Sequence, residues 1–190
     1  MPPKVKITKE EIIETALSLL RENGEQSINA RTVAAALHCS TQPIFSNFAT
    51  MEELQKAVDT AAYELYLGFL QSEAEGEIYP KYKAFGMAYI RFAEEEKALF
   101  KHLFMCDRRG AALVPTVDFE ASVEMIMNAN GISKEKASLM HLEMWALVHG
   151  IATMLATSFL NLGWDTISDM LTDVYQGIRA RHLPKEDNCQ

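Results

Sequence analysis

The fold is decided by residues 24–54, which read GEQSINARTVAAALHCSTQPIFSNFATMEEL. Asn29 and Ser40 are residue types that cap helices, and each precedes a short run of apolar residues at helical spacing. Between the two runs lies the tight connection His38–Cys39. Two short helices joined by a turn of three to four residues, with a helix before them, are typical of a helix-turn-helix.

The preceding helix is predicted from its two ends. Thr8 and Glu11 have the spacing of a capping box, and Asn23–Gly24 is a typical helix stop. Between them, Ile12, Ala16 and Leu20 belong to one apolar face.

The rest of the chain is also helical by periodicity, without a useful alternating strand pattern or a repeat. We expect a long fourth helix after Ala49–Thr50, a fifth opened by Pro80, a sixth over 98–105, a seventh over 116–129, an eighth from a cap at Ser133 to about Leu162, and a ninth capped by Asp165. The predicted fold class is all-α with nine helices.

We expect a helix-turn-helix domain over 1–50, a ligand-binding and dimerisation domain over 51–183 and a disordered polar tail over 184–190. Residues 1–50 hold five basic and five acidic residues, so the net charge of -8 belongs to the remainder. No acidic residue lies between Ser27 and Thr50. A locally neutral face on an acidic body remains compatible with DNA binding.

The composition excludes fibrous and disulfide-stapled proteins, with 48% hydrophobic and 23% charged residues in 190. Cys39, Cys106 and Cys189 show no disulfide or metal spacing, which fits a reducing compartment. No apolar segment follows the N-terminal charges as in a signal peptide, and polar residues interrupt the uncharged stretch 144–164. We expect a cytoplasmic protein without a membrane span.

The second helix of the pair carries a polar face suited to base edges and phosphates, made by Thr41, Gln42, Ser46 and Asn47. We expect Ala34, Ala35 and Ala36 to let the two helices cross closely, and Ser40 to leave the helix N-terminus open to a phosphate. The alternative is a three-helix cap on a helical bundle whose polar helix is merely solvated.

Residues 24–54 resemble the DNA-binding signature of the TetR family of transcriptional regulators. Positions that match the family pattern are Gly24, Asn29, Arg31, Val33, Ala34, Ser40, Ile44, Phe48 and Glu52–Leu54. The chain departs from it in three places: His38–Cys39 replaces Gly-Val, Phe45 replaces a phosphate-binding Tyr, and Met51 replaces a Lys. The resemblance implies DNA contacts by Lys4, Lys6, Asn29, Arg31, Ser40, Thr41, Gln42, Pro43, Phe45, Ser46 and Asn47.

The resemblance also implies that the last two helices pair with those of a second subunit. The eighth helix is apolar on more than one side and therefore needs two partners, which favours a symmetric dimer. The expected interface residues are Ile151, Leu155, Phe159, Met170, Val174, Tyr175 and Ile178.

Trp145, His149 and Gly150 resemble the Trp-x-x-x-His-Gly signature of one TetR subgroup. They predict either a pocket wall with a polar anchor or a core Trp with a satisfied His at a close helix crossing. Candidate ligand-binding residues are Tyr66, Phe69, Phe85, Tyr89, Phe92, Phe104, Met105, Met125, Met144, Trp145 and His149, any of which could instead fill a core.

We find no Ser, His and Asp in the order of a catalytic triad, no Gly-rich phosphate loop and no pair of catalytic carboxylates within a supporting motif. We therefore expect that the protein is not an enzyme and has no cofactor, no catalytic site and no metal site. A weak alternative is a metal shared by His102 and Cys106 with His141 or Asp107. Cys39 could be a redox handle but more simply fills an apolar turn position.

These features predict a homodimeric repressor that leaves a pseudo-palindromic operator when a small, largely apolar effector binds. The alternatives are a helical small-molecule binder or enzyme that has lost DNA binding, an activator, and a repressor relieved by a protein partner.

Overall fold

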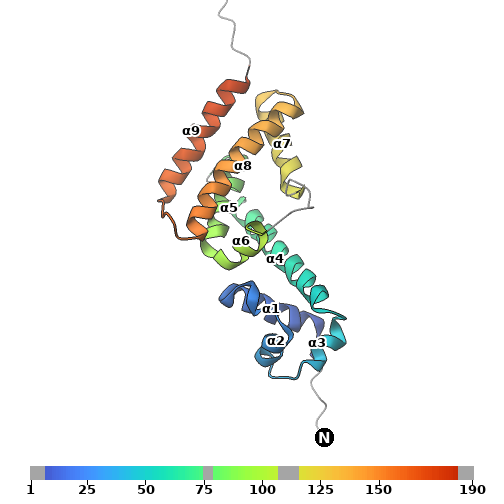
Figure 1. The fold of residues 1–190 in the computed structure, drawn as a ribbon. Helices are drawn as coiled ribbons and strands as arrows, with labels where there is room; N and C mark the ends of the chain where they lie inside the picture. Colours follow the sequence, from blue (N-terminus) through green and yellow to red (C-terminus); the bar gives the residue numbers. More distant parts are fainter. Residues whose placement is uncertain (1–6, 75–78, 107–115, 184–190) are drawn as a thin grey trace, which may run out of the picture. The chain divides into compact units, whose positions relative to one another are not determined.

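The computed structural model describes residues 7–74, 79–106 and 116–183. Within these residues the protein has nine α-helices, a single turn of 3₁₀ helix and no strand, so the all-α prediction is confirmed (Figure 1). The elements are α1 (Lys9–Asn23), η1 (Glu25–Ser27), α2 (Ala30–Ala36), α3 (Gln42–Asn47), α4 (Met51–Ala74), α5 (Lys81–Glu95), α6 (Lys97–Phe104), α7 (Thr116–Asn130), α8 (Lys134–Ala156) and α9 (Trp164–His182).

The chain divides into two compact units. The first contains the described residues up to Phe69 together with Glu95–Cys106, and the second contains the described parts of 70–94 and 107–190. The division differs from the expected boundary at residue 50, because most of α4 and all of α6 belong to the first unit.

The first unit is organised around α1, which packs against α2, α3 and α6. Its N-terminus has the predicted capping box: the Glu11 amide donates to Thr8 Oγ1 at 3.1 Å, and the Thr8 amide donates to Glu11 Oε2 at 2.8 Å. Ile12, Ala16 and Leu20 are fully buried on one face. Gly24 follows the helix at a φ of 78°, a left-handed value that suits glycine.

The helix pair α2 and α3 follows the predicted positions closely. Asn29 Oδ1 accepts a hydrogen bond from the Thr32 amide at 3.0 Å and so caps α2. Only Ala34 of the three alanines is buried, while Ala35 and Ala36 are exposed. The expectation of three small residues at a helix crossing is therefore wrong for two of them, because adjacent helical positions do not share a face.

The helix α6 completes the interior of the first unit. Leu99 and Phe100 are fully buried, and the Phe100 and Phe104 rings lie 5.4 Å apart. Tyr66 of α4 meets Phe104 edge-on, with ring centroids 5.0 Å apart. These contacts explain why a segment near residue 100 belongs with the N-terminal helices.

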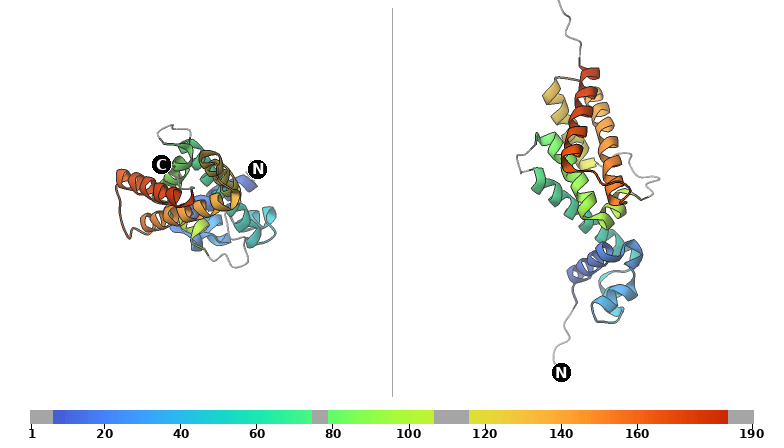
Figure 2. Two further views of the ribbon diagram at one scale, coloured as in Figure 1. Left: turned by 90° about the horizontal axis from the view of Figure 1, so that it is seen from above. Right: turned by 90° about the vertical axis from the view of Figure 1, so that its left-hand side faces the viewer.

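The second unit is built on α8, which packs against α7 and α9; the three lie side by side in both views of Figure 2. Its buried interior includes Val123 and Ile126 of α7 and Ala137 and Met140 of α8. By length and composition alone α8 could cross a membrane, a test that the core helix of a soluble protein also passes.

The eighth helix ends at Ala156, six residues before the predicted end at Leu162. The amides of Ser158 and Phe159 donate to the carbonyls of Leu155 and Met154, and Ser158 adopts a φ of 56°. This is the hydrogen-bond pattern of a Schellman motif, which ends a helix. Nothing in the sequence indicated it, because the uncharged residues continue beyond Ala156. The last helix begins at Trp164 after Gly163, so the prediction that Asp165 is its cap is also wrong.

Candidate functional site

The predicted polar surface belongs to α3, a helix of six residues. Its N-cap is Thr41, whose side chain makes no cap hydrogen bond, and not Ser40 as predicted. Pro43 in the first turn explains the difference, because proline has no N–H to offer a capping oxygen.

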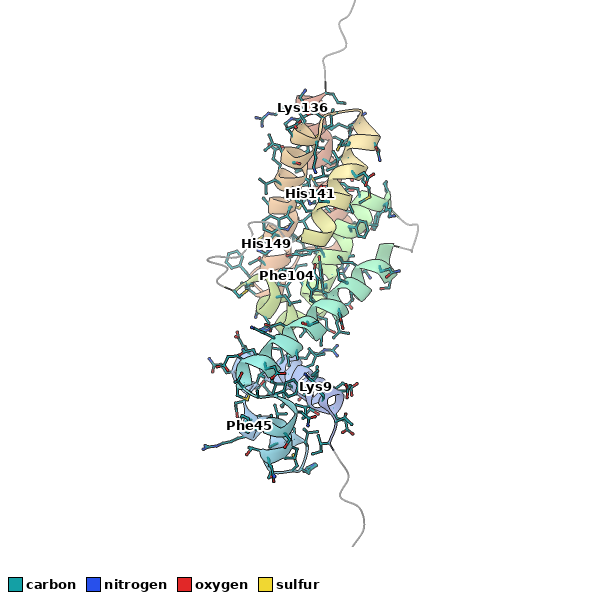
Figure 3. All side chains as sticks on the ribbon, turned by 90° about the vertical axis from the view of Figure 1, so that its right-hand side faces the viewer. Lys9, Phe45, Phe104, Lys136, His141 and His149 are labelled. Atoms are coloured by element: carbon teal, nitrogen blue, oxygen red, sulfur yellow. The ribbon has the colours of Figure 1, made fainter. Side chains whose placement is uncertain are left out.

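One face of α3 is buried and the other is open. Ile44 and Phe48 are buried, whereas Gln42, Phe45 and Ser46 are exposed. Figure 3 labels Phe45 on this part of the chain. Phe45 exposes 51% of its surface.

Two of the expected base readers are already hydrogen-bonded to the chain. Ser46 Oγ donates to the carbonyl of Gln42 at 2.9 Å. Asn47 Nδ2 donates to the carbonyl of Pro43 at 2.8 Å and to that of Ile7 at 3.4 Å. The side chain of Gln42 makes no hydrogen bond within the described residues, which leaves its amide available to a partner.

The remaining predicted DNA contacts are scattered around α2 and α3. Arg31 and Ser40 are exposed, and Thr41 and Pro43 are half-buried. The Asn29 side chain serves as the α2 cap. Lys4 and Lys6 lie outside the described residues.

The connection between α2 and α3 contains a strained residue. His38, which stands where the family pattern has Gly, adopts a φ of 52° and is exposed. A left-handed conformation costs a residue with a Cβ atom about 1–2 kcal/mol, whereas glycine adopts it freely. The neighbouring Cys39 is a half-buried free thiol.

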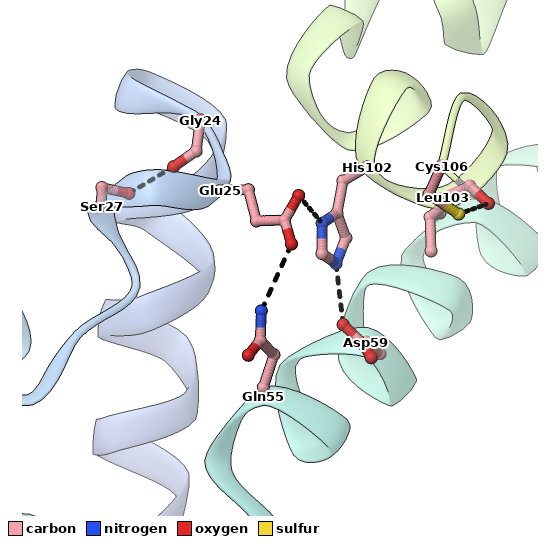
Figure 4. Close-up of polar contacts among 8 residues, drawn as sticks. All are labelled: Gly24, Glu25, Ser27, Gln55, Asp59, His102, Leu103 and Cys106. Atoms are coloured by element: carbon pink, nitrogen blue, oxygen red, sulfur yellow. Dashed lines mark hydrogen bonds and ion pairs between the residues drawn. The ribbon is translucent and has the colours of Figure 1, made fainter. Parts of the chain in front are cut away.

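A polar cluster within the first unit joins η1, α4 and α6 (Figure 4). His102 Nε2 lies 2.7 Å from Asp59 Oδ1, and its Nδ1 lies 3.8 Å from a Glu25 carboxylate oxygen. Gln55 Nε2 donates to the other oxygen of Glu25 at 3.4 Å. The cluster was missed from the sequence because its members lie up to 77 positions apart, from residue 25 to residue 102.

A second polar contact joins α1 to the residue that precedes α6. Arg21 of α1 forms a two-pronged ion pair with Glu96, in which Nε donates to Oε2 at 2.9 Å. The hydrogen bond with Glu96 raises the pKa of Arg21.

These contacts bear on the weak metal alternative. No group of three His, Cys, Asp or Glu side chains suited to a metal ion is found among the described residues. Instead His102 faces two carboxylates, His141 belongs to the other unit, and Asp107 lies outside the described residues.

In the second unit, α5 and α8 share two tyrosine–histidine hydrogen bonds. Tyr82 Oη lies 2.9 Å from His141 Nδ1, and Tyr89 Oη lies 2.9 Å from His149 Nδ1. From the first pair to the second, the tyrosines advance by seven residues on α5 and the histidines by eight on α8, about two turns in each case. The two helices therefore run parallel. The Tyr82–His141 pair was not predicted, because its pairing requires the register of α5 against α8.

The surroundings of the two histidines keep them neutral. Burial lowers the pKa of His141 to about 4 and also lowers the pKa of His149. The His149 ring stacks on Trp145 with centroids 5.0 Å apart, and the Phe119 ring meets His141 edge-on at 4.9 Å. Burial of Tyr82 raises its pKa, so this phenol also stays neutral.

The predicted ligand-binding residues fall into two groups, one in each unit. Tyr66, Phe69, Phe104 and Met105 belong to the first unit, and Phe85, Tyr89, Phe92, Met125, Met144, Trp145 and His149 belong to the second. Tyr89, Trp145 and His149 contact one another in a chain, whereas Phe92 is 1% exposed in the core and Met105 is exposed. Phe69, Phe85 and Met125 are half-buried, and Met144 is buried.

The predicted dimer residues divide between the interior and the surface of the second unit. Ile151 and Leu155 are buried within the single chain, and Tyr175 and Ile178 pack against the α7–α8 cluster. Phe159 is 81% exposed and Val174 is 36% exposed, while Met170 is half-buried.

An exposed apolar stripe on α8 begins before the residues expected at the dimer interface. Leu139, Leu142 and Ala146 are exposed at intervals of three and four, and among the described residues no neighbouring element comes within 4 Å of where a Cβ atom would stand at Gly150. The sequence indicates that this helix is apolar on more than one side, but the expected interface residues on it begin at Ile151 and so do not include Leu139 and Leu142.

Neither a scan against protein-family models nor a search of curated proteins gives a match for this chain. The TetR resemblance of residues 24–54 therefore stays a prediction.

Proposed function

We propose that this protein is a ligand-responsive, DNA-binding transcription regulator of the TetR type that acts as a homodimeric repressor. The observation that carries the proposal is the pair of short helices α2 and α3 braced on α1, with Gln42 and Phe45 exposed on the second helix. A recognition helix needs this exposure to reach base edges in the major groove.

The charge pattern supports the same partner. The exposed α3 surface belongs to a stretch without acidic side chains from Ser27 to Thr50, although the whole chain carries a net charge of -8. Carboxylates repel the phosphate backbone, so an acidic protein can approach DNA only through a surface without acidic side chains. Arg31 is an exposed cation within it.

A homodimer is supported by the apolar stripes on α8 and α9. Leu139, Leu142 and Ala146 on α8 and Val174 on α9 leave apolar surface exposed in the single chain. Pairing these stripes across a two-fold axis would remove them from water, and a two-fold symmetric dimer is the assembly that matches a pseudo-palindromic operator.

The proposed effector is a small, largely apolar molecule bound by the second unit. Tyr89, Trp145 and His149 bring three rings and a few polar atoms together, and burial lowers the pKa of the histidine and so favours its neutral form. Aromatic side chains with a few polar atoms suit an uncharged ligand. The effector must bind more tightly to the state that does not bind DNA, since otherwise no population shifts.

The rival is a helical small-molecule binder that has lost DNA binding. It is favoured by α3 itself, which has no cation and uses Ser46 and Asn47 in hydrogen bonds to its own backbone. The two functions are separated by titrating the purified protein with duplex DNA from the flanks of its own gene and with a random duplex, at several salt concentrations. The regulator binds its flanking DNA more tightly than the random duplex, and its affinity falls as salt rises. No binding to either duplex at low salt overturns the DNA-binding proposal and favours the rival.

A further inference from the structure

The side chain of Phe45 is an unusual feature of the exposed face of α3. Its neighbours Ile44 and Phe48 are buried, yet half of the surface of Phe45 is open. An aromatic ring exposed in this way contributes little to the folded core, and its apolar area gains by meeting an apolar partner.

The residues beside Phe45 on α3 indicate what kind of group this partner presents. Gln42 lies three positions before Phe45, so the two share one helix face. Ser46 Oγ and Asn47 Nδ2 donate to main-chain carbonyls and keep only their acceptor atoms for a partner, so at this face of α3 the Gln42 amide is the exposed donor and the Phe45 ring the exposed apolar group. Phe45 has no hydroxyl with which to bind a phosphate oxygen.

We propose that Phe45 packs on the 5-methyl group of a thymine in the major groove, beside the base contacted by Gln42. The proposal rests on the proposed DNA-binding function and names a specificity determinant within it. Thymine is the base that presents a methyl group in the major groove, and apolar side chains read it by contact.

The test begins with a library of random duplexes, each about 30 base pairs long, a length that spans two half-sites. The duplex that the wild-type protein selects from this library is then used for the binding measurements. Each thymine of the selected duplex is replaced in turn by deoxyuridine, which removes the methyl group and leaves the base pair intact. We expect one symmetry-related pair of thymines at which the affinity falls about fourfold per half-site, the value of one buried methyl.

Variants assign that loss to the side chain. Phe45→Ala should bind the thymine and uracil duplexes equally, whereas Gln42→Ala should keep the full discrimination while losing affinity for the duplex as a whole. Because both side chains are exposed, neither variant should change the thermal unfolding midpoint, which is measured beside the binding.

The outcomes separate this proposal from the one on which it rests. If the library yields no enriched duplex, the DNA-binding function falls. If a duplex is selected but uracil is tolerated at every position, or if Phe45→Ala still discriminates thymine from uracil, the methyl contact of Phe45 is overturned and the DNA-binding function stands.

Discussion

The Nε2 atom of His102 lies 2.7 Å from Oδ1 of Asp59, which joins α6 to α4 within the first unit. The His102 side chain is 9% exposed and its other nitrogen faces Glu25 at 3.8 Å. The two carboxylates thus hold a largely buried imidazole from two different elements.

Replacing Asp59 should destabilise the first unit. Asp59→Ala leaves a buried imidazole nitrogen without its partner, which we expect to cost about 1 kcal/mol, at the low end because the aspartate itself is half exposed. Urea unfolding measures the change. Glu64→Ala removes an exposed carboxylate from the same helix and serves as the control; equal losses in the two variants would contradict a role for the pair.

Because His141 is buried beside Tyr82, the free energy of unfolding should decrease as the pH is lowered. The pKa of His141 is about 4 in the folded protein, against about 6.5 in the unfolded chain. Between these values the unfolded chain binds a proton that the folded chain does not, so stability falls as pH decreases from 6.5 to 4. We expect about 1–2 kcal/mol from this group, reduced because the ring keeps some solvent contact.

The contribution of His141 is isolated with His141→Gln, which keeps a polar side chain but does not titrate. The free energy of unfolding is measured from about pH 7 to about pH 4 for both proteins. The wild-type protein should lose more stability than the variant over this interval. Parallel pH profiles would show that His141 does not stay neutral in the folded state.

His38→Gly should stabilise the protein. The substitution removes the strain of a side chain at a φ of 52°, and the gain is partly offset by the greater freedom of glycine in the unfolded chain. We expect a net gain of about 0.5–1 kcal/mol in thermal or urea unfolding. His182→Gly makes the same change at a helical position, in the last turn of α9, and serves as the control. This variant should lower the stability of the protein, because glycine is unfavourable within a helix.

Aspartate on the exposed apolar stripe should prevent dimerisation. Leu142 is 48% exposed in the single chain, so Leu142→Asp leaves the protomer folded but places an unpaired carboxylate in the proposed interface. Sedimentation should then give a monomer, and Val174→Asp should do the same. Lys81→Asp changes an exposed site on α5 and should stay dimeric. A dimeric Leu142→Asp protein would move the interface elsewhere.

Met51→Lys should increase the salt dependence of DNA binding. Met51 begins α4 shortly after α3, and the family pattern has Lys there. Two added phosphate contacts per dimer would steepen the slope of log K against log salt by about 0.9 each, on specific and random DNA alike. Glu64→Gln makes the same change in net charge farther along α4 and is the control. An unchanged slope for Met51→Lys would show that this residue does not face the DNA backbone.

Helix positions were predictable where the signal was local. Thr8, Asn29 and Ser133 accept the cap hydrogen bonds expected of them, since a cap depends on residues three positions apart. The end of α8 was not predictable in the same way, because Ser158 makes a stop that glycine usually makes.

The candidate site was predictable only in part. The sequence placed Gln42 and Phe45 on one short helix, but it could not show that Ser46 and Asn47 bind their own backbone. Nor could it pair Tyr82 with His141 or His102 with Asp59, because each pair depends on how two distant helices meet.

The discontinuous make-up of the first unit has a consequence for synthesis on the ribosome. Its N-terminal helices emerge first, but the interior also needs Leu99 and Phe100, which follow the intervening segment 70–94. A nascent chain that ends before α6 therefore leaves apolar surface of α1 and α4 exposed to solvent or to chaperones. A fusion protein that takes the N-terminal helices but ends at residue 50 or 69 would therefore lack part of their interior. To keep the first unit complete, it must include the chain through Cys106.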